Sequence, residues 1–266
     1  MSSNGIEPAS EIPGSPVLLD WQPGADASGL APDEIRVWLV ELDAGLDAEE
    51  DVDSAEPGPE LALLAADEQA RAARFVRARD RRRFVRCRAA LREILGGLLR
   101  KPPGSLRFGT GGQGKPELDH PRVGADRTED RADLRFNVSH SSELALIAVH
   151  VGRELGVDLE RVRPISEADR IVSSFFSPAE QGEFAAIAND AKSLAFLRGW
   201  TRKEAILKGL GIGLAGLAAH YETGFATSDL TPQFLPAVPS ARVDRWQLWE
   251  AAPRAGFVAA LAVHLL

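Results

Sequence analysis

The sequence predicts an α+β fold made of two similar halves, each a small, mainly antiparallel sheet packed against a long helix. Three observations support this prediction. Short apolar runs are typical of strands, and two long stretches have the three-to-four-residue apolar spacing of helices. In each half a helical stretch (FVRCRAALREILGGLL, then FLRGWTRKEAILKGLG) precedes a strand that ends in small apolar residues (LALIAVH, then VAALAVHLL), which indicates a duplicated unit.

The boundary between the halves is expected near residues 151–152, where a glycine begins a turn. This divides the chain into an N-terminal half at residues 33–151 and a C-terminal half at residues 152–266. Residues 1–32 are rich in Ser, Pro, Gly and acidic residues, so we expect them to form a poorly ordered tail.

The first half begins with a strand at residues 35–42, followed by an acidic loop and a long arginine-rich helical region at residues 61–99. A Lys-Pro-Pro-Gly run ends that region. The glycine-rich segment GTGGQGKP has neither the spacing nor the following helix of a phosphate-binding loop. We expect the acidic loop at residues 43–60, a short strand at 106–108 and the glycine-rich loop at 109–116. A polar loop is expected at residues 119–133, and two hairpin strands at 134–140 and 144–150.

The second half begins with a strand at residues 155–162. The sequence SPAE at residues 177–180 is a capping box with proline at the first helical position, so a helical stretch begins there. It breaks near residues 189–190 and continues as a helix at residues 196–209, which a run of glycines ends. We expect a loop or weak strand at residues 223–239, and two closing strands at residues 243–250 and 257–266.

Composition describes an ordinary soluble protein of 266 residues, with 44% hydrophobic and 26% charged residues. The net charge of −8 argues against a dedicated nucleic-acid-binding protein. The single cysteine, Cys87, permits no internal disulfide, which suits a reducing cytosol. No apolar run approaches the ~20 residues of a membrane span, and the N-terminus lacks the features of a signal peptide. We therefore expect a cytoplasmic protein that binds neither membrane nor nucleic acid.

The helix at residues 196–209 carries a charge in an unusual place. Its apolar stripe consists of Phe196, Trp200, Leu207 and Leu210. Glu204 lies on the same stripe, where an unpaired carboxylate costs roughly 2–7 kcal/mol. Lys208 follows four residues later, within reach of Glu204. The simplest alternative is a solvated ion pair between these two residues at the rim of the helix.

Two further acids, Asp158 and Glu160, share one face of the strand at residues 155–162, roughly 6.5–7 Å apart along it. Together with Glu204 they make three carboxylates, and such oxygen ligands favour magnesium or manganese. The basic groups expected nearby are Arg83, Lys115, Lys203, Lys208 and His140. The sum indicates a site for a diphosphate with its metal, hence phosphoryl transfer or hydrolysis.

The helical region at residues 61–99 carries ten arginines in an otherwise acidic chain. They are Arg71, Arg74, Arg77, Arg79, Arg81, Arg82, Arg83, Arg86, Arg88 and Arg92. Either they form a solvated helix face, or guanidinium groups on this helix bind phosphate. Nucleic acid is the weaker version of the second alternative, because no aromatic platform accompanies the arginines.

Five groups of residues follow one another in a characteristic order and spacing. They are Gly114-Lys115-Pro116, Phe136-Asn137-Val138-Ser139-His140, Gly156-Val157-Asp158-Leu159-Glu160, Phe176-Ser177 with Glu180, and Trp200-Thr201-Arg202-Lys203-Glu204-Ala205 with Lys208. Over about residues 60–215 the chain thereby resembles the 4'-phosphopantetheinyl transferase superfamily, in its long, surfactin-synthetase-activator type. The resemblance implies a pseudo-dimer of two α+β halves that binds coenzyme A in the cleft between them and acts as a monomer.

The resemblance also implies roles for single residues. Asp158, Glu160 and Glu204 would hold Mg2+ against the pyrophosphate of coenzyme A. Lys203, Lys208 and His140 would contact phosphate oxygens.

The remaining implied contacts lie at the nucleotide end of coenzyme A. Arg71 and Arg83 would hold the 3'-phosphate end. Lys115, Pro116 and Ser139 would border the adenosine. Glu68 departs from the pattern, since many relatives carry a basic residue there.

The implied reaction transfers 4'-phosphopantetheine from coenzyme A to a serine of an apo acyl or peptidyl carrier protein and releases 3',5'-ADP. The metal and the lysines would stabilise charge on the phosphoryl and leaving oxygens. Asp158, Glu204 and Lys208 form the expected catalytic set. Either Glu204 or Lys208 takes the serine proton, and Glu204, being also a metal ligand, would do so through a water on the metal.

Carrier proteins are usually acidic, as this chain is, so the overall charge should slow their encounter. We therefore expect local, largely apolar docking near residues 165–176 and 184–197; alternatively, those residues are ordinary core.

Two other functions agree with the same residues. A magnesium-dependent phosphohydrolase would use the three acids on a diphosphate without a protein acceptor. A non-catalytic nucleotide-binding or nucleic-acid-binding module would use the arginine-rich helix alone.

Overall fold

Two four-stranded sheets form the centre of the protein. The computed structural model describes residues 17–20, 29–31, 33–45, 58–111, 115–119, 133–213, 218–225, 235–236 and 246–265. The strand order is β1-β2-β6-β5 in the first sheet and β7-β10-β9-β8 in the second, with a separate β3-β4 hairpin. All neighbouring strands pair antiparallel except β1 and β2, which are parallel.

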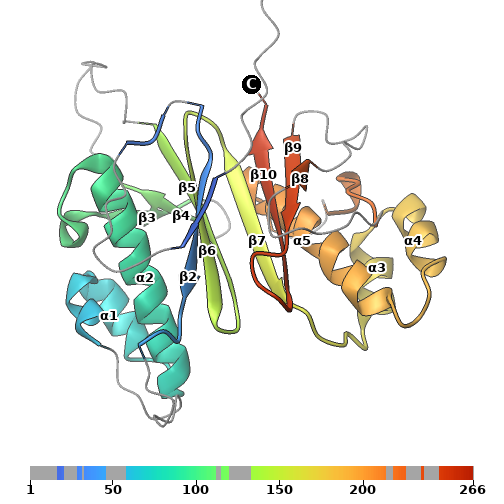
Figure 1. The fold of residues 1–266 in the computed structure, drawn as a ribbon, viewed down its shortest axis with the longest axis horizontal. Helices are drawn as coiled ribbons and strands as arrows, with labels where there is room; N and C mark the ends of the chain where they lie inside the picture. The colour runs from blue at the N-terminus through green and yellow to red at the C-terminus, as the bar shows by residue number, and fades with distance from the viewer. Residues whose placement is uncertain are drawn as a thin grey trace, which may run out of the picture.

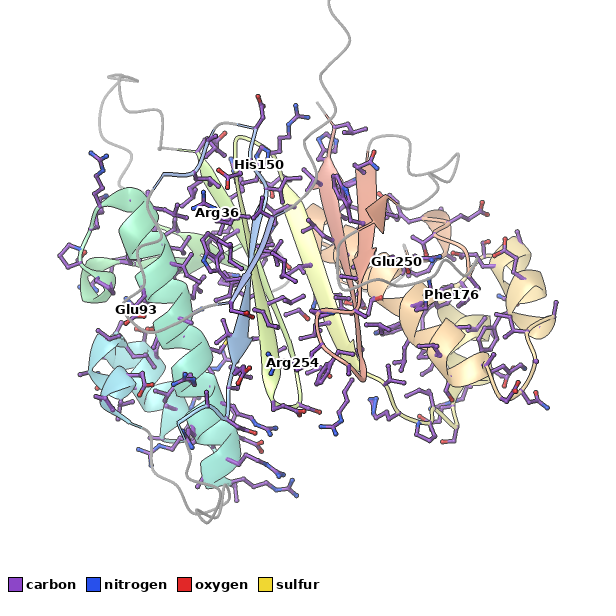
Figure 2. The ribbon with its side chains drawn as sticks, in the orientation of Figure 1. Arg36, Glu93, His150, Phe176, Glu250 and Arg254 are labelled. Atoms are coloured by element: carbon purple, nitrogen blue, oxygen red, sulfur yellow. The ribbon has the colours of Figure 1, made fainter. Side chains whose placement is uncertain are left out.

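The sheets pack face to face, and each carries helices on its outer face (Figure 1). Helix α2 covers the first sheet, and α5, with α3 and α4 beyond it, covers the second. Apolar side chains of both sheets form one core between them, including Val37, Leu146, Val157, Trp249 and Leu261. Other apolar side chains fill the spaces between each sheet and its helices, while many further side chains project from the surface (Figure 2). The result is a helix–sheet–sheet–helix sandwich whose central seam brings the two halves together.

The N-terminal half contributes most of the first sheet and helix α2. Its strands are β1 (Val17–Asp20), β2 (Arg36–Glu41), β3 (Phe108–Thr110), β4 (Pro116–Leu118), β5 (Leu134–Ser141) and β6 (Leu144–Val151). Its helices are the short 3-10 turns at Pro59–Leu63 and Pro103–Ser105, α1 (Ala66–Ala72) and α2 (Ala78–Leu99). Leu91, Ile94, Leu95 and Leu98 of α2 pack on the outer face of the sheet, as its helical spacing predicts.

The C-terminal half repeats the arrangement with a second sheet and a second long helix. Its strands are β7 (Leu155–Arg161), β8 (Leu235–Pro236), β9 (Trp246–Ala251) and β10 (Phe257–His264). Its helices are α3 (Ala168–Phe175), α4 (Pro178–Ala185), α5 (Lys192–Leu210) and a 3-10 turn at Ala218–His220. The capping box that the sequence predicts at Ser177 is present, with Glu180 as its second member.

The α+β class and the antiparallel sheets predicted from the sequence are confirmed. The poorly ordered tail expected at residues 1–32 stays a prediction: Val17–Asp20 within it form β1 beside β2, and residues 1–16, 21–28 and 32 lie outside the described residues. The weak strand expected at residues 223–239 is reduced to Leu235–Pro236 within the described part of that range. The expected boundary at residues 151–152 falls in the turn between the two sheets and, as a domain boundary, stays a prediction. In the described parts of the chain no helix is long and apolar enough to cross a membrane.

Candidate active site

Strands β5 and β7 meet at the seam between the sheets, where side chains replace the usual backbone ladder. Asn137 Oδ1 accepts a hydrogen bond from the backbone N–H of Val157 at 3.0 Å. Ser139 Oγ accepts one from the N–H of Leu159 at 3.2 Å. Ser141 Oγ continues the pattern with the N–H of Arg161 at 3.1 Å. Every second residue of β5 therefore anchors β7, because alternate side chains on a strand share one face.

The same hydroxyl groups hold the two carboxylates of β7. Ser139 Oγ donates to Asp158 Oδ1 at 2.9 Å, and Ser141 Oγ donates to Glu160 Oε2 at 3.0 Å. Asp158 is buried with 5% exposure, so its carboxylate needs these partners. The seam thus fixes the position of both acids that the sequence placed on one face of this strand.

Helix α5 crosses β7 at very close range because glycines face each other there. A Cβ atom added to Gly156 would overlap the backbone of Ala205 and Gly209. This approach brings Lys208 to the seam, where its Nζ lies 2.6 Å from Asp158 Oδ1 and 2.9 Å from Ser139 Oγ. Lys208 therefore pairs with Asp158, whereas the simplest alternative from the sequence was a solvated pair with Glu204.

Glu204 enters the same space from α5. It shares one pocket of about 320 Å³ with residues of β5 and β7 and with Trp200 and Lys208. The lining residues are Val138, Ser139, His140, Asp158, Leu159, Glu160, Trp200, Glu204 and Lys208. The three carboxylates that the sequence singled out therefore line a single pocket, although they come from two segments more than forty residues apart.

Charge and burial in this pocket shift the pKa values of its acids. Burial, together with the neighbouring charges of Asp158 and Glu160, raises the pKa of Glu204 to about 7, although Lys208 opposes the shift. Burial, with the charge of Asp158, also raises the pKa of Glu160. These raised pKa values indicate that the pocket holds more negative charge than its buried surroundings stabilise. A bound cation would offset this excess negative charge.

His140 lies on the basic side of the pocket. Burial lowers the pKa of His140, and the positive charges of Lys208, Arg71 and Arg83 lower it further. The arginines of α1 and α2 predicted to bind phosphate are therefore close enough to influence this histidine. Lys208, Arg71 and Arg83 thus place positive charge near His140, which lines the pocket.

The fit of the carboxylates to a metal ion rests on two oxygen atoms. Among the described residues, Asp158 Oδ2 and Glu204 Oε1 are buried without a hydrogen-bond partner, whereas most buried polar atoms in proteins have one. Within the same residues, no group of three or more His, Cys, Asp or Glu side chains is arranged tightly enough to hold a metal ion. Lys208 occupies the other oxygen of Asp158. The donor set suits a hard cation, but its members are gathered only loosely around the lysine.

The position of Lys203 differs from the one predicted from the sequence. We expected it to contact phosphate, but its side chain is fully buried and away from the pocket lining. Its Nζ instead bonds Glu180 Oε2 at 3.0 Å and the carbonyl oxygens of Ala218 and Tyr221 at 3.0 and 2.7 Å. Neighbouring helical residues are turned about 100° apart, so Lys203 and Glu204 lie on different flanks of α5.

Lys115 and Pro116 lie beside a second, smaller pocket of about 130 Å³, which they share with Phe136 and Glu154. Lys115 Nζ bonds Glu154 at 2.9 Å and the carbonyl oxygen of Gly209 at 3.2 Å. The β3-β4 hairpin is therefore attached to the C-terminal end of α5. Neither residue lines the carboxylate pocket, so their expected place beside adenosine stays a prediction.

Several arginines of α2 form ion pairs with acidic residues. Arg83 Nε bonds Asp43 Oδ1 at 2.8 Å, and Arg71 lies over the ring of Phe84. The other pairs are Arg86 with Glu60, and Arg88 and Arg92 with Glu68. Glu68 also caps α1, which explains an acid at this position. Part of α2 is therefore held in place by ion pairs with acidic residues. Arg83 of α2 and Arg71 of α1 lie near His140.

Chemical reasoning from the sequence did not assign functions to Asn137, Ser141 and Gly156. A polar residue at every second position of an otherwise apolar strand was the available signal for Asn137 and Ser141. A glycine inside a strand was the signal for Gly156, since it marks a close backbone approach.

Comparison with known proteins agrees with this geometry. Residues 154–262 match the family described as the 4'-phosphopantetheinyl transferase superfamily, and residues 58–152 match the family described as 4'-phosphopantetheinyl transferase, N-terminal. The chain is similar to 4'-phosphopantetheinyl transferase HetI of Nostoc sp., with 37% identity over 91% of this chain and 93% of the relative.

Two other relatives are similar over a shorter length. One is the putative 4'-phosphopantetheinyl transferase slr0495 of Synechocystis sp., with 37% identity over 58% of this chain and 60% of the relative. The other is the L-aminoadipate-semialdehyde dehydrogenase-phosphopantetheinyl transferase of Xenopus laevis, with 29% identity over 56% of this chain and 49% of the relative.

Proposed function

The chain belongs to the 4'-phosphopantetheinyl transferase superfamily, and from this premise we propose that it transfers 4'-phosphopantetheine from coenzyme A to a serine of an apo carrier protein and releases 3',5'-ADP. The observation that carries the proposal is the pocket in which Asp158, Glu160, Glu204 and Lys208 converge at the seam. A diphosphate linkage needs this combination of acids for a cation and a lysine for phosphate.

Asp158, Glu160 and Glu204 would hold Mg2+, or Mn2+ in its place. Supporting this assignment are the unpartnered oxygens of Asp158 and Glu204 among the described residues and the raised pKa of Glu204. The bound ion would supply neutralisation of the phosphate charge and polarisation of the phosphoryl oxygens. Ser139 and Ser141 keep the two strand acids in place by hydrogen bonds.

Lys208 and His140 would contact the phosphate oxygens. The ammonium of Lys208 already lies in the pocket and has a flexible stem, so it can bond a phosphate oxygen instead of Asp158. Its charge would then oppose the negative charge that develops on the leaving oxygen of 3',5'-ADP.

In the transfer step the carrier serine Oγ forms a bond to the phosphorus on the pantetheine side, and the bond from that phosphorus to the ADP oxygen breaks. The serine proton must leave as the new bond forms, and we assign it to Glu204. Glu204 lines the pocket, and its Oε1 has no hydrogen-bond partner among the described residues, which supports this assignment. Lys208, which is paired with Asp158, keeps its proton in this assignment.

The nucleotide end of coenzyme A would extend toward the N-terminal half. Arg71 and Arg83 would hold the 3'-phosphate, which agrees with their electrostatic influence on His140. Lys115, Pro116 and Ser139 would border the adenosine. Arg83 would have to share its guanidinium between Asp43 and the phosphate.

The carrier protein would dock on a groove of about 350 Å³ next to the active pocket, where apolar side chains lie beside the charged Arg163 and Glu167. The two share Glu160 and Trp200, and the groove is further lined by Ile165, Ile171 and Phe196. Its position would bring a serine on the carrier close to Glu204. Ile165, Ile171 and Phe196 fall within the segments that the sequence predicted for docking.

The enzyme would act as a monomer in the cytoplasm. Both halves of one chain line the pocket, which supports a monomeric enzyme. Cys87 is buried and free, which agrees with a reducing compartment.

Mass spectrometry of an apo carrier protein tests the proposal. The carrier should gain the mass of one phosphopantetheine group when incubated with the enzyme, coenzyme A and Mg2+, and should gain nothing with a chelator in excess. Release of 3',5'-ADP without any change of the carrier would instead indicate a phosphohydrolase.

A further inference from the structure

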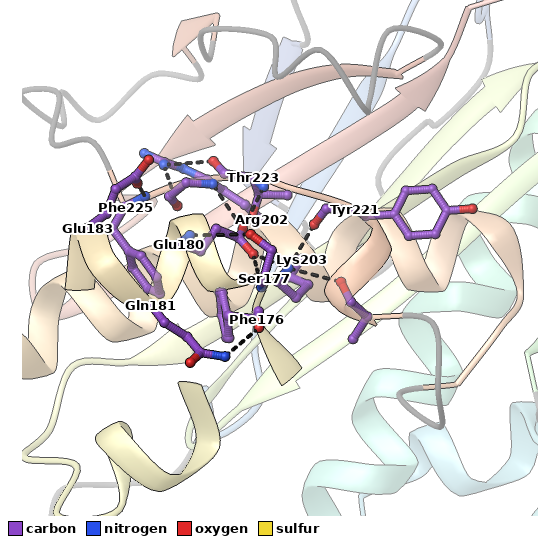
Figure 3. A network of polar contacts seen from close by, with 12 residues as sticks. Phe176, Ser177, Glu180, Gln181, Glu183, Arg202, Lys203, Tyr221, Thr223 and Phe225 are labelled. Carbon is purple, nitrogen blue, oxygen red and sulfur yellow. Dashed lines mark hydrogen bonds and ion pairs between the residues drawn. The ribbon is translucent and has the colours of Figure 1, made fainter. Parts of the chain in front are cut away.

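The C-terminal half contains a buried polar network at the side of α5 away from the sheet (Figure 3). Lys203 lies at its centre with 0% exposure, and Glu180 beside it has 1%. Lys203 Nζ also lies 4.3 Å from the centroid of the Phe176 ring. A fully buried lysine is rare in proteins, so its position here requires the full set of partners that surrounds it.

Glu180 joins the segments that meet at Lys203. Its Oε2 accepts hydrogen bonds from Lys203 Nζ at 3.0 Å and from the N–H of Ser177, the N-cap of α4, at 2.8 Å. Its Oε1 accepts from the N–H groups of Thr223 and Gly224 at 2.8 and 3.2 Å. One carboxylate thereby ties α5 to the start of α4 and to residues 218–225, and Figure 3 shows these contacts together.

Helical geometry relates this network to the active pocket. With about 100° of turn per residue, Ala205 and Gly209 lie roughly 200–240° around the helix from Lys203. They are the residues that touch Gly156 of the sheet. Glu204 and Lys208 lie roughly 100–140° around, on the flank between these two contacts. The helix is thus held on opposite sides, and the flank between them carries the active-site groups.

We propose that the buried Lys203–Glu180 pair is a positioning device that fixes the rotation of α5 and so aims Glu204 and Lys208 into the pocket. The inference rests on the proposed transferase function. A rotation of roughly 10° would displace a side-chain tip about 6 Å from the helix axis by ~1 Å. A displacement of that size at reacting groups can lower a rate about a hundredfold. Lys203 and Glu180 touch no substrate and act only through the helix.

A matched pair of variants tests the proposal. Lys203→Met removes the ammonium and keeps most of the stem. Arg92→Met removes an equally buried cation that pairs with Glu68 in the other half. Both should lower the melting temperature, because each removes a buried cation from beside a carboxylate that stays buried. All assays are run well below the melting temperature of either variant, with wild-type transfer to a carrier as the reference.

We expect Lys203→Met to lower kcat roughly 10–100-fold with KM for coenzyme A within about threefold of wild type. Arg92→Met should leave kcat within about twofold. Lys203→Arg, which keeps a cation beside Glu180, should recover part of the lost kcat. If Lys203→Met does not fold, Glu180→Gln replaces it with the same expectation.

Equal kcat losses in Lys203→Met and Arg92→Met would overturn the proposal, as would an unchanged kcat in Lys203→Met. So would a loss that lies entirely in KM for coenzyme A. Failure of the wild-type enzyme to modify any carrier would instead refute the proposed function.

Discussion

Lys208 Nζ lies 2.6 Å from Asp158 Oδ1, so a lysine of α5 neutralises a carboxylate on β7 at the bottom of the active pocket. The side chain of Asp158 is 6% exposed and that of Lys208 is 29% exposed. The aspartate is therefore fixed, while the lysine keeps contact with solvent and room to move. The cation of this pair is the member suited to meet a phosphate group.

Lys208→Met is expected to lower kcat/KM for coenzyme A by about 10²–10³, because a charge that stabilises the leaving oxygen is lost. Steady-state transfer to a carrier protein measures the effect. Lys192→Met is the control, since Lys192 lies on the same helix but pairs with Asp169 at the surface. A Lys208→Met enzyme that is as active as the control would rule out the phosphate contact.

Glu204→Gln is expected to abolish transfer and to stabilise the metal-free protein at neutral and alkaline pH. The folded pKa of Glu204, about 7, lies above the ordinary value of 4.5, so the folded state holds this proton more tightly than the unfolded state does. The contribution of Glu204 to stability is then greatest below about pH 4.5, falls as pH rises to about 7 and stays low above it. At pH 8 the variant should be more stable by roughly 1–3 kcal/mol.

Chemical unfolding between pH 5 and pH 8 in the presence of a chelator measures this difference. Glu167→Gln serves as the control, because Glu167 forms an exposed pair with Arg170. The stability difference between wild type and Glu204→Gln should change across this pH range, whereas that of the control should not. A pH-independent difference would show that Glu204 titrates normally.

The sequence predicted which residue types form the site better than it predicted which side chains point into the pocket. Period-two spacing placed Asp158 and Glu160 on one face, and helical spacing placed Glu204 on a stripe that had to pack on a sheet; the pocket brings the three together. Lys203 was assigned to the wrong side of its helix. Its partners come from residues 177–180 and 218–221, and no local pattern indicates that these segments would cover that face.

Long-range pairing explains the other differences from the sequence-based predictions. Val17–Asp20 is a four-residue strand in a polar context, and it is placed by pairing with β2 and by the packing of Leu18 and Leu19 against the cores. The arginines of α2 looked alike in the sequence, but in the structure Arg88 and Arg92 pair with Glu68 from a distant segment, whereas Arg83 lies near His140. Propensity and periodicity do not contain such contacts.

Gly156→Ala is expected to destabilise the fold by about 1–3 kcal/mol, because its Cβ would overlap the backbone of Ala205 and Gly209 and force α5 away from β7. Transfer activity should fall as well, since Glu204 and Lys208 lie on the displaced turn. Gly182→Ala in α4 is the control: nothing lies within 4 Å of its added Cβ, so it should be neutral or stabilising by up to ~1 kcal/mol. Thermal unfolding that ranks the two variants equally would contradict the close packing.

Ile171→Glu tests the carrier groove. Ile171 lines the groove beside Trp200, so a carboxylate there would remove apolar contact and repel an acidic carrier. We expect KM for the carrier to rise about tenfold while KM for coenzyme A stays unchanged, because the groove is separate from the nucleotide end of the site. Val17→Glu, at an exposed apolar position in β1, is the control for added charge and should change neither constant.

Salt dependence separates apolar docking from charge steering in the same assay. Docking on Ile165, Ile171 and Phe196 should leave the carrier KM of the wild-type enzyme nearly constant between low and moderate ionic strength, because apolar contacts are not screened. A carrier KM that rises steeply with salt would mean that charged contacts dominate. In that case the effect of Ile171→Glu should come mainly from repulsion and should shrink as salt screens it, so the groove would bind the carrier through charge and not through apolar contact.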